Sequence, residues 1–485
     1  MPNSKGVMSN WRWYLCALLF VATTVNYMDR QVLSMTWKEF IAPEFHWTDE
    51  NYGDITAFFS VVYACISIFA GKFIDWMGTK KGYLWAIGIW SLGACLHAGC
   101  GWATVQFGNI PGVQSSADLI QATGDAAVLI ATLSVYLFIV CRTVLALGEA
   151  GNFPAAIKVT AEYFPKKDRA FATSIFNAGA SVGALAAPLT IPALAAAYGW
   201  EMAFIIIGGL GFIWMFFWAF MYEVPGKCKH VNEAELAYIN QDEAAEAAAK
   251  PAEAAPAEEK TIPMLQCFTF KQTWAFLAGK FFTDGVWWFF LFWAPSYFQD
   301  QFGYKASSPM GQALIFTLYL IVTVLSIGGG YLPKYFVEKK GMEPYAGRML
   351  SMLIFAFFPI FALFAQPLGA YSAWWPAIII GLAGAGHQAW SANLYSTIGD
   401  MFPKSTVATI TGIGTLAGGI GSAIINSGSG KLFTYAAEQG SAFSFMGFEG
   451  KPAGFMIVFC ICAVAYLIAW SIMKTLVPKY KKIEV

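Results

Sequence analysis

Apolar residues in this chain form long unbroken runs rather than alternating with polar ones. Four clear runs, 170–198, 306–333, 405–430 and 452–473, contain no Asp, Glu, Lys or Arg. Each exceeds the roughly 20 residues that an α-helix needs to cross a lipid bilayer. A transmembrane β-barrel would need short segments of alternating hydrophobicity, so the pattern excludes it. The chain is therefore predicted to be an all-α membrane protein surrounded by a lipid bilayer.

Twelve such apolar spans can be delimited, in two groups of six. In the first group we expect helices at 11–37, 52–74, 81–102, 126–157, 169–191 and 202–222. In the second group we expect helices at 272–297, 311–335, 349–365, 373–398, 405–432 and 453–475.

A polar stretch divides the chain into parts. We expect an N-terminal half at 1–222, a cytoplasmic linker at 223–271 and a C-terminal half at 272–485. Within the linker, the Glu-, Lys- and Ala-rich piece 242–260 cannot bury a core, so it is predicted to be solvated and partly helical.

The two halves carry traces of an internal duplication. The residues Gly148, Glu149, Phe164, Pro165, Lys166 and Gly183 have counterparts 238 residues later in Gly386, His387, Phe402, Pro403, Lys404 and Gly421. Matches in one register support a repeat of the fourth and fifth helices, and two related halves with substrate between them form a transporter architecture. Small residues crowd the fifth and eleventh spans, which predicts either a sliding surface between the halves or ordinary tight packing.

Composition limits the kind of protein further. Only 12% of the 485 residues are charged, which is about half the fraction in a soluble protein. The net charge of zero gives no basis for a nucleic-acid partner. The nine cysteines lie mostly in apolar runs and form no C-x-x-C pair, so we expect them to be small buried residues.

Loop charges predict the orientation in the membrane. Lys and Arg gather in the loops after the second, fourth and eighth spans and in the C-terminal tail, whereas 97–141 contains neither. The positive-inside rule then places both termini and the linker in the cytoplasm. The apolar segment 13–28 has no A-x-A cleavage site, so it is predicted to be the first membrane helix. We expect a multi-pass protein of the bacterial inner membrane, with 102–125 as an external loop.

Charged side chains inside membrane spans are costly and indicate functional sites. Asp29 and Arg30 fall in the first span, and Arg142 and Glu149 fall in the fourth. Arg142 and Glu149 are two helical turns apart, so they share a face and are expected to interact. An incoming anion would compete for the arginines, and a carboxylate that loses its partner protonates more readily. This predicts coupling of proton uptake to anion binding; a purely structural ion-pair network is the alternative.

The C-terminal half carries further candidates. Lys280 lies near the expected start of its helix, where it can snorkel toward water. Asp284 lies one turn deeper, where a substrate role is the alternative to a structural one. His387 occupies the position of Glu149 in the repeat, and we expect it either to bind substrate or to be a packing residue. The tryptophans of this seventh span are expected to pack against lipid or neighbouring helices, with stacking on a sugar as the alternative. Three uncharged residues are candidate ligands for substrate hydroxyls: Asn177, Gln388 and Asn393.

The loop after the second span resembles a signature of the major facilitator superfamily. It reads GKFIDWMGTKK over 71–81, against the family pattern G-x-x-x-D-R-x-G-R-R/K. Asp75 and the glycines match, while Trp76 and Thr79 depart from the pattern. The resemblance implies twelve transmembrane helices in two pseudo-symmetric six-helix halves, and a cytoplasmic gating latch in which Asp75 meets a neighbouring helix.

Within that superfamily the chain resembles the anion:cation symporter family. The similarity rests on NYMDR at 26–30, on Arg142 with Glu149, and on FFTDGVWWFFLFWAPSYF at 281–298. The last stretch is similar to hexuronate and aldonate transporters. Ala180 stands where galactonate-type members carry a substrate-binding Gln, which favours hexuronates over galactonate.

The same resemblance implies roles for the matching residues. Asp29 and Glu149 would bind protons, and Arg30 and Arg142 would engage the substrate carboxylate or its charge partner. Tyr27 and Tyr63 would hydrogen-bond the substrate.

These observations predict a proton-coupled symporter of sugar acids, such as glucuronate or galacturonate, that works by alternating access. The alternative is an exchanger or facilitator of the same fold for an aldonate, a dicarboxylate or phosphate, and the choice between H⁺ and Na⁺ stays open. An enzyme is disfavoured because the four histidines lack H-E-x-x-H spacing. We expect no metal or other cofactor, no nucleic-acid partner and a monomer.

Overall fold

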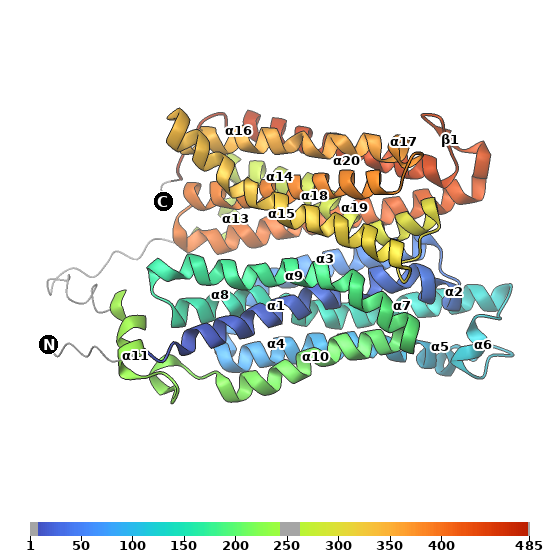
Figure 1. Cartoon of the computed structure of the whole chain (residues 1–485), viewed down its shortest axis with the longest axis horizontal. Coiled ribbons are helices and arrows are strands. Elements are labelled where there is room, and N and C mark those ends of the chain that lie inside the picture. The colour runs from blue at the N-terminus through green and yellow to red at the C-terminus, as the bar shows by residue number, and fades with distance from the viewer. Residues whose placement is uncertain (1–7, 243–261, 484–485) are drawn as a thin grey trace.

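The computed structural model describes residues 8–242 and 262–483. Most of that part is helical, and the long helices run side by side along one direction (Figure 1). They form two layers in this view, and the two termini lie at the same end of the molecule. Except for Asp242, the low-complexity piece 242–260 lies outside the described residues.

The N-terminal half forms the lower layer of Figure 1. Its long helices are α1 (Trp11–Thr36), α3 (Asp49–Met77), α4 (Thr79–Leu96), α7 (Asp125–Glu149), α9 (Lys166–Tyr198) and α10 (Trp200–Met221). Its shorter elements are the π-helical turn η1 (Trp37–Ile41), α2 (Ala42–Phe45), η2 (His97–Gly99), α5 (Cys100–Gly108), α6 (Ser116–Leu119) and α8 (Asn152–Tyr163). The segment 102–125, which we expected only as a loop, thus contains the end of α5 and all of α6.

The C-terminal half forms the upper layer. Its long helices are α14 (Lys271–Phe302), α15 (Pro309–Lys340), α16 (Pro344–Ala356), α18 (Trp374–Met401), α19 (Lys404–Gln439) and α20 (Lys451–Leu476). Its shorter elements are η4 (Phe358–Phe364), α17 (Ala365–Gly369), η5 (Gly440–Ala442) and the antiparallel pair β1 (Ser444–Phe445) and β2 (Phe448–Glu449). The linker contributes η3 (Pro225–Lys227), α11 (Glu233–Ile239) and α13 (Met264–Cys267).

Hydropathy separates the long helices into two groups. Eight helical segments of the described chain are long and apolar enough to cross a membrane, and 33% to 50% of their most apolar stretch is buried within the protein. The long helices α1, α14, α18 and α19 are the other four, and together the two groups agree with the twelve predicted spans. Most residues of α1, α14 and α18 are buried among other helices. A helix surrounded by protein can carry polar side chains that lipid would exclude.

Local sequence explains several of the helix ends. α3 begins with a capping box, in which Thr48 and Asn51 each bond to the other's backbone N–H. α15 begins where the Ser308 side chain accepts a hydrogen bond from the N–H of Gly311. α14 ends at Gly303, whose φ of 71° is a left-handed conformation that glycine adopts without strain.

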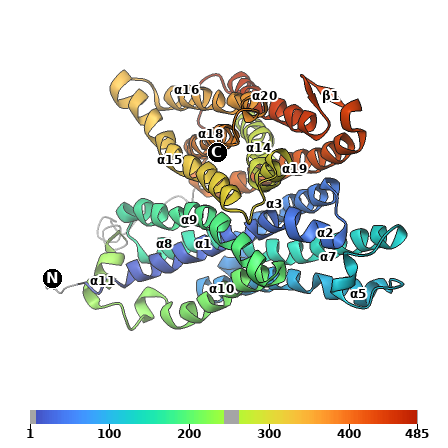
Figure 2. The ribbon, with the colours of Figure 1, turned by 45° about the vertical axis from the view of Figure 1, so that its right-hand side comes forward.

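Small residues hold α3 and α19 together across the boundary between the halves (Figure 2). A Cβ atom added at Gly419 would lie 2.3 Å from the Cβ of Ala64, and one added at Gly53 would lie 2.7 Å from the carbonyl oxygen of Asn426. Glycine therefore permits this close approach. In α9, by contrast, Gly183 packs against α1 of the same half. At that position the small residue tightens one half rather than forming a surface between the two.

Ion pairs join the two halves at one end of the molecule. Lys38 lies 3.2 Å from Asp300 of the other half, and Lys451 lies 2.6 Å from Asp49. Lys38 also pairs with Asp49, and Lys451 with Asp300, within their own halves. We call Lys38, Asp49, Asp300 and Lys451 the four-charge cluster. Nearby, the N–H of Glu50 donates to Thr434 across the same boundary.

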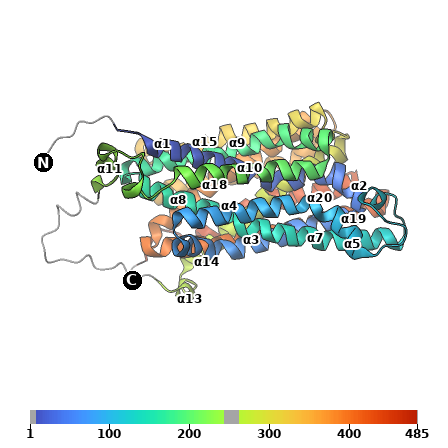
Figure 3. The ribbon, with the colours of Figure 1, turned by 90° about the horizontal axis from the view of Figure 1, so that it is seen from below.

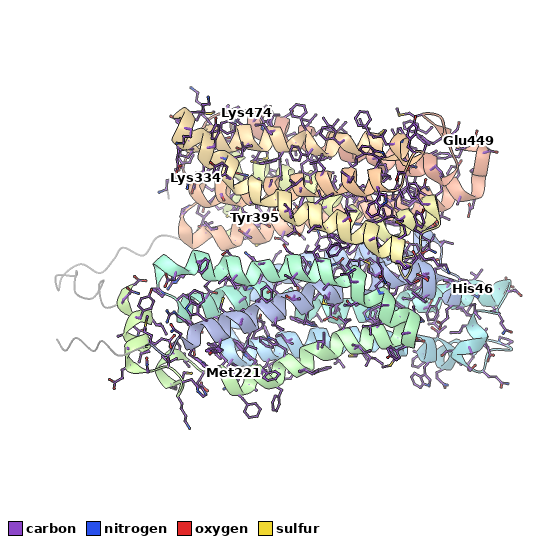
Figure 4. All side chains as sticks on the ribbon, viewed as in Figure 1. His46, Met221, Lys334, Tyr395, Glu449 and Lys474 are labelled. Atoms are coloured by element: carbon purple, nitrogen blue, oxygen red, sulfur yellow. The ribbon has the colours of Figure 1, made fainter. Side chains whose placement is uncertain are left out.

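The predicted cytoplasmic loops share the opposite end of the molecule. Lys334 and Lys474 lie at the end that holds the termini, whereas His46 and Glu449 lie at the other end (Figure 4). Seen from below, α11 of the linker also lies with the termini, and α5 lies far from them (Figure 3). Lys38 lies in η1, Asp49 begins α3, Asp300 lies near the end of α14 and Lys451 begins α20. Lys451 follows the labelled Glu449 by two residues, so the four-charge cluster belongs to the end away from the termini.

Candidate functional site

An ion pair between α1 and α7 forms the centre of the candidate site. Nε and Nη2 of Arg30 donate to the same oxygen of Glu149 at 3.0 and 2.9 Å. The side chains are 5% and 0% exposed, so the pair lies inside the N-terminal half. Spacing along the chain favoured Arg142 as the partner of Glu149; the structure selects Arg30 instead, because the folded bundle brings the Arg30 side chain of α1 to the Glu149 carboxylate of α7.

Arg142 lies beside this pair with much of its hydrogen-bonding capacity unused. Its Nη2 donates to the carbonyl oxygen of Arg30 at 3.4 Å, and its guanidinium lies 4.8 Å from the ring centre of Phe59. Its Nε and Nη1 have no hydrogen-bond partner among the described residues, and the residue is fully buried. A guanidinium with free donors suits a planar oxyanion such as a carboxylate.

The carboxylates of the site also have unused acceptors. Asp29 is 1% exposed, and neither of its carboxylate oxygens has a hydrogen bond of good geometry within the described chain, although the equally unpaired Trp90 indole lies near it. The same holds for Oε1 of Glu149 and for the amide of Asn26. Buried polar groups without partners are costly, so a cluster of them at one place indicates a site that binds something.

Aromatic rings surround the Arg30 guanidinium. Its central carbon lies 5.4 Å from the ring centre of Tyr27 and 4.6 Å from that of Tyr63. The third ring, Trp288 at 5.0 Å, belongs to α14 of the other half. Arg30 therefore meets both halves, as a substrate-binding residue in a two-half transporter should. Stacking on a sugar was one of the roles considered for Trp288, but its contact with Arg30 could not be predicted, because it depends on how the halves pack.

His387 and Asn393 on α18 make contacts within the C-terminal half. His387 lies 2.7 Å from the hydroxyl of Tyr466 and stacks on Trp287, with ring centres 5.4 Å apart. The Asn393 amide donates to the Gly329 carbonyl of α15 at 3.0 Å. These contacts fit the packing role that we considered for His387, and they give Asn393 a role in joining two helices.

The remaining predicted residues are spread over the molecule. Gln388 is half-buried on α18, and Asn177 is exposed on α9. Asp75, at the end of α3, is exposed and pairs with Lys158 of the neighbouring helix α8 at 2.7 Å. That geometry is the one expected of the latch, although both helices belong to the same half; the gating role stays a prediction.

Lys280 does not snorkel, contrary to our expectation. α14 begins at Lys271, so Lys280 lies in its third turn inside the bundle. Its amine lies 2.5 Å from Asp284 and donates to the Tyr395 hydroxyl at 2.9 Å, and the Lys280 and Asp284 side chains are only 7% and 11% exposed. Among the described residues, no group of three or more His, Cys, Asp or Glu side chains could hold a metal ion.

Comparison with known proteins agrees with this fold. The chain is 26% identical to a hexuronate transporter of Escherichia coli (strain K12), over all of this chain and 97% of that one. It is 25% identical to a galacturonate transporter of Dickeya chrysanthemi, over 73% of this chain and 92% of that one.

Solved structures with the same fold are more distant in sequence. A bacterial homologue of the human lysosomal transporter Spinster, in an inward-facing and unoccupied conformation, has a TM-score of 0.68 at 16% identity, covering 96% of this chain and 97% of that one. A D-xylose–proton symporter has a TM-score of 0.63 at 15% identity, covering 94% and 97%. These relatives are transporters rather than enzymes. The sequence profile of the Major Facilitator Superfamily matches residues 19–425, and the chain belongs to that superfamily of membrane transporters.

Proposed function

We propose that this protein is a proton-coupled symporter of sugar acids, with hexuronates such as glucuronate and galacturonate as its substrates. The observation that carries the proposal is the buried Arg30–Glu149 ion pair beside an Arg142 that has free donors. Relatives named for hexuronate and galacturonate transport support this substrate class.

Binding of the substrate begins at the arginines. A sugar-acid carboxylate can accept hydrogen bonds from the free donors of Arg142 and compete with Glu149 for Arg30. Tyr27 and Tyr63 border the Arg30 guanidinium, so they can hydrogen-bond substrate oxygens. Asn177, Gln388, Asn393 and His387 remain candidate contacts for the hydroxyl groups.

Coupling follows from the charge balance of the site. Arg30 and Arg142 together offset Asp29 and Glu149, so a bound anion leaves one negative charge in excess. An excess charge in a buried site is costly, and uptake of a proton removes the excess. Asp29 and Glu149 are the groups proposed to take that proton, because each is buried and has unused oxygens.

Alternating access needs the two halves to open at one end while they are joined at the other. The four-charge cluster joins the halves at the end away from the termini. We propose that both termini lie in the cytoplasm of a bacterial cell and that the protein acts as a monomer in the inner membrane. The described conformation is then closed toward the outside, and the Asp75–Lys158 pair contributes to gating at the cytoplasmic end.

Uptake into proteoliposomes tests the proposal. A gradient of one pH unit supports up to about tenfold accumulation if one proton moves with each substrate. We expect glucuronate to accumulate on an inward proton gradient. Accumulation on a sodium gradient instead would assign Na⁺ as the coupling ion, and uptake without accumulation on either gradient would favour an exchanger or facilitator.

Glu149→Gln separates binding from coupling. Glutamine resembles the protonated carboxyl group permanently, so the variant should still exchange labelled substrate against unlabelled substrate. It should lose accumulation on a pH gradient because it has no proton to release. Glu338→Gln, an exposed acidic residue paired with Lys334, serves as the control. Accumulation by Glu149→Gln at the control's level would remove Glu149 from the coupling mechanism.

A further inference from the structure

One face of α14 carries charged residues toward the proposed site. Lys280, Asp284 and Trp288 follow one another at intervals of four residues, so they lie along the same side of the helix. Trp288 is the residue that reaches Arg30 of the other half, at 5.0 Å. Four residues correspond to about 6 Å of helix. Asp284 therefore lies one turn, and Lys280 two turns, from the contact between the halves.

Tyr395 of α18 lies next to this face. Its hydroxyl accepts a hydrogen bond from Lys280 at 2.9 Å, and the Lys280 amine lies 4.8 Å from its ring centre. Tyr395 lies on the side of the C-terminal half that is turned toward the N-terminal half (Figure 4). Since Trp288 on the same side of α14 contacts Arg30 and Tyr395 contacts Lys280, we expect Lys280, Asp284 and Tyr395 to lie on the side of the C-terminal half that is turned toward the arginine site.

The position of Asp284 is restricted by α19. A Cβ atom at Gly418 would lie 2.3 Å from Oδ2 of Asp284, so only glycine leaves room for the carboxylate there. Oδ2 also pairs with Lys280 at 2.5 Å. A carboxylate accepts up to about four hydrogen bonds, and the pair with Lys280 leaves acceptors on Oδ1.

Charge differs between the two sides of the site. On the N-terminal side, Arg142 offers free guanidinium donors to an anion. On the C-terminal side, Asp284 neutralises Lys280 at 2.5 Å, so the side has no free positive charge. A monocarboxylate sugar acid has a matching polarity, with its carboxylate at one end and hydroxyl groups along the rest. A dicarboxylate would place its second negative charge against Asp284.

We propose that Lys280, Asp284 and Tyr395 form a specificity subsite that accepts substrate hydroxyl groups and rejects a second carboxylate. This inference rests on the proposed function and defines its substrate class more narrowly. Asp284 accepts a hydrogen bond from a substrate hydroxyl group. The Tyr395 hydroxyl donates a hydrogen bond to another substrate hydroxyl or accepts one from it. Lys280 holds Asp284 in place. Rejection follows because a like charge in a buried site is strongly unfavourable.

The test compares two sugar acids of the same chain length. Glucuronate has one carboxylate and galactarate has two, and the affinity of purified protein for each is measured by inhibition of labelled glucuronate uptake in proteoliposomes. The variants change the charge of the subsite in steps: Lys280→Gln makes it more negative, Asp284→Asn makes it more positive, and the double variant leaves it neutral. Glu338→Gln serves as the control, because it breaks an exposed ion pair with Lys334 that has the same four-residue spacing as Lys280 and Asp284.

The wild type and the control should prefer glucuronate. Asp284→Asn should raise the affinity for galactarate relative to glucuronate by roughly tenfold or more, because it removes the like charge and frees Lys280. The double variant should show a smaller rise in that ratio, and Lys280→Gln should lower it. A helix-packing role alone would change both affinities together and leave their ratio constant.

Each other result has a definite meaning. A ratio that stays at the wild-type value in Asp284→Asn and in the double variant overturns the subsite, as does a wild type that prefers galactarate. If Asp284→Asn does not fold, the double variant decides, because it leaves no unpaired charge. Failure of the wild type to bind either sugar acid overturns the proposed function, and the subsite with it.

Discussion

The four-charge cluster should control how readily the halves separate at the end away from the termini. Lys38 lies 3.1 Å from Asp49 and 3.2 Å from Asp300, and Lys451 lies 2.6 Å from Asp49 and also pairs with Asp300. When the halves part, the pairs Lys38–Asp300 and Lys451–Asp49 must break, while the other two stay within their own halves. Opening therefore costs these two ion pairs of the cluster, besides the longer contact of Glu39 with Lys305 at 4.0 Å.

The size of this cost follows from exposure. The four side chains are between 8% and 23% exposed. Each bridging pair should therefore stabilise the closed state by about 1 kcal/mol, at the upper end of the range for surface pairs. Lys38→Met removes one bridging pair and should favour the open state by about fivefold. Removing both bridging pairs corresponds to about 2 kcal/mol, or about 30-fold.

Crosslinking measures this equilibrium. Cysteines at Glu50 and Thr434 would be close when this end is closed, because the Glu50 N–H lies 2.9 Å from the Thr434 hydroxyl. In a protein whose native cysteines are replaced, a short thiol crosslinker should react more slowly after Lys38→Met. Lys334→Met, at the opposite end of the molecule, should leave the rate unchanged.

A charge exchange tests the reasoning directly. Lys38→Asp alone should slow crosslinking more than Lys38→Met, because it places like charges together. Adding Asp300→Lys restores an opposite pair and should recover much of the rate. Two results would mean that the cluster does not stabilise the closed end. One is a crosslinking rate after Lys38→Met equal to that of the double-cysteine protein with an intact cluster. The other is a rate in the Lys38→Asp, Asp300→Lys protein that is no higher than in Lys38→Asp alone.

Three further predictions concern binding, topology and the linker. Arg142→Ala should weaken glucuronate binding by roughly 10- to 100-fold, with Lys restoring little of it, because a point charge cannot replace the two-donor contact; unchanged inhibition of uptake would exclude Arg142 from binding. Cysteines at Lys229 and Ala117 should react oppositely with a membrane-impermeant thiol reagent in whole cells, and equal labelling would contradict the topology. Glu235 of α11 pairs with Arg12 at 2.8 Å; burial raises its pKa, but hydrogen bonds from Ser9 and the start of α1 outweigh that effect, so its pKa lies below the ordinary value. Its stabilisation of the docked linker helix should therefore be full at neutral pH and lost only as the pH falls below about 4. Glu235→Gln should lower the protection of α11 amides from hydrogen exchange at pH 7 by an amount that corresponds to about 3 kcal/mol; equal protection factors, corrected for the intrinsic exchange rate, at pH 7 and pH 3.5 in the wild type would contradict this.

Much of the fold follows from the one-dimensional pattern of the chain. Apolar runs long enough to span a bilayer predict membrane helices, since every backbone polar group in lipid must be satisfied within the helix. The repeat that relates Glu149 to His387 predicted two similar halves. The charged residues Asp29, Arg30, Arg142 and Glu149 were also identifiable, because a charge within an apolar span is costly wherever its partner lies.

The pairing of those charges depended on tertiary structure. Spacing on one helix suggested Arg142 for Glu149, but the folded bundle brings Arg30 of α1 to it and leaves donors of Arg142 free. Likewise, Trp288 reaches Arg30 only because α14 meets α1 at the boundary between the halves.

The same difference, between properties of single segments and contacts between packed helices, holds for the whole protein. The sequence by itself determined which segments cross the membrane and which charged side chains are costly to place inside it. The membrane segments and the costly side chains both follow from the free energy of transferring a single segment into the bilayer. Only the tertiary structure decided that Lys280 is buried against Asp284 and Tyr395, and that Lys38 and Lys451 connect the halves. Such contacts join residues that are distant along the chain or depend on where a helix begins, so their energies exist only once the helices have packed.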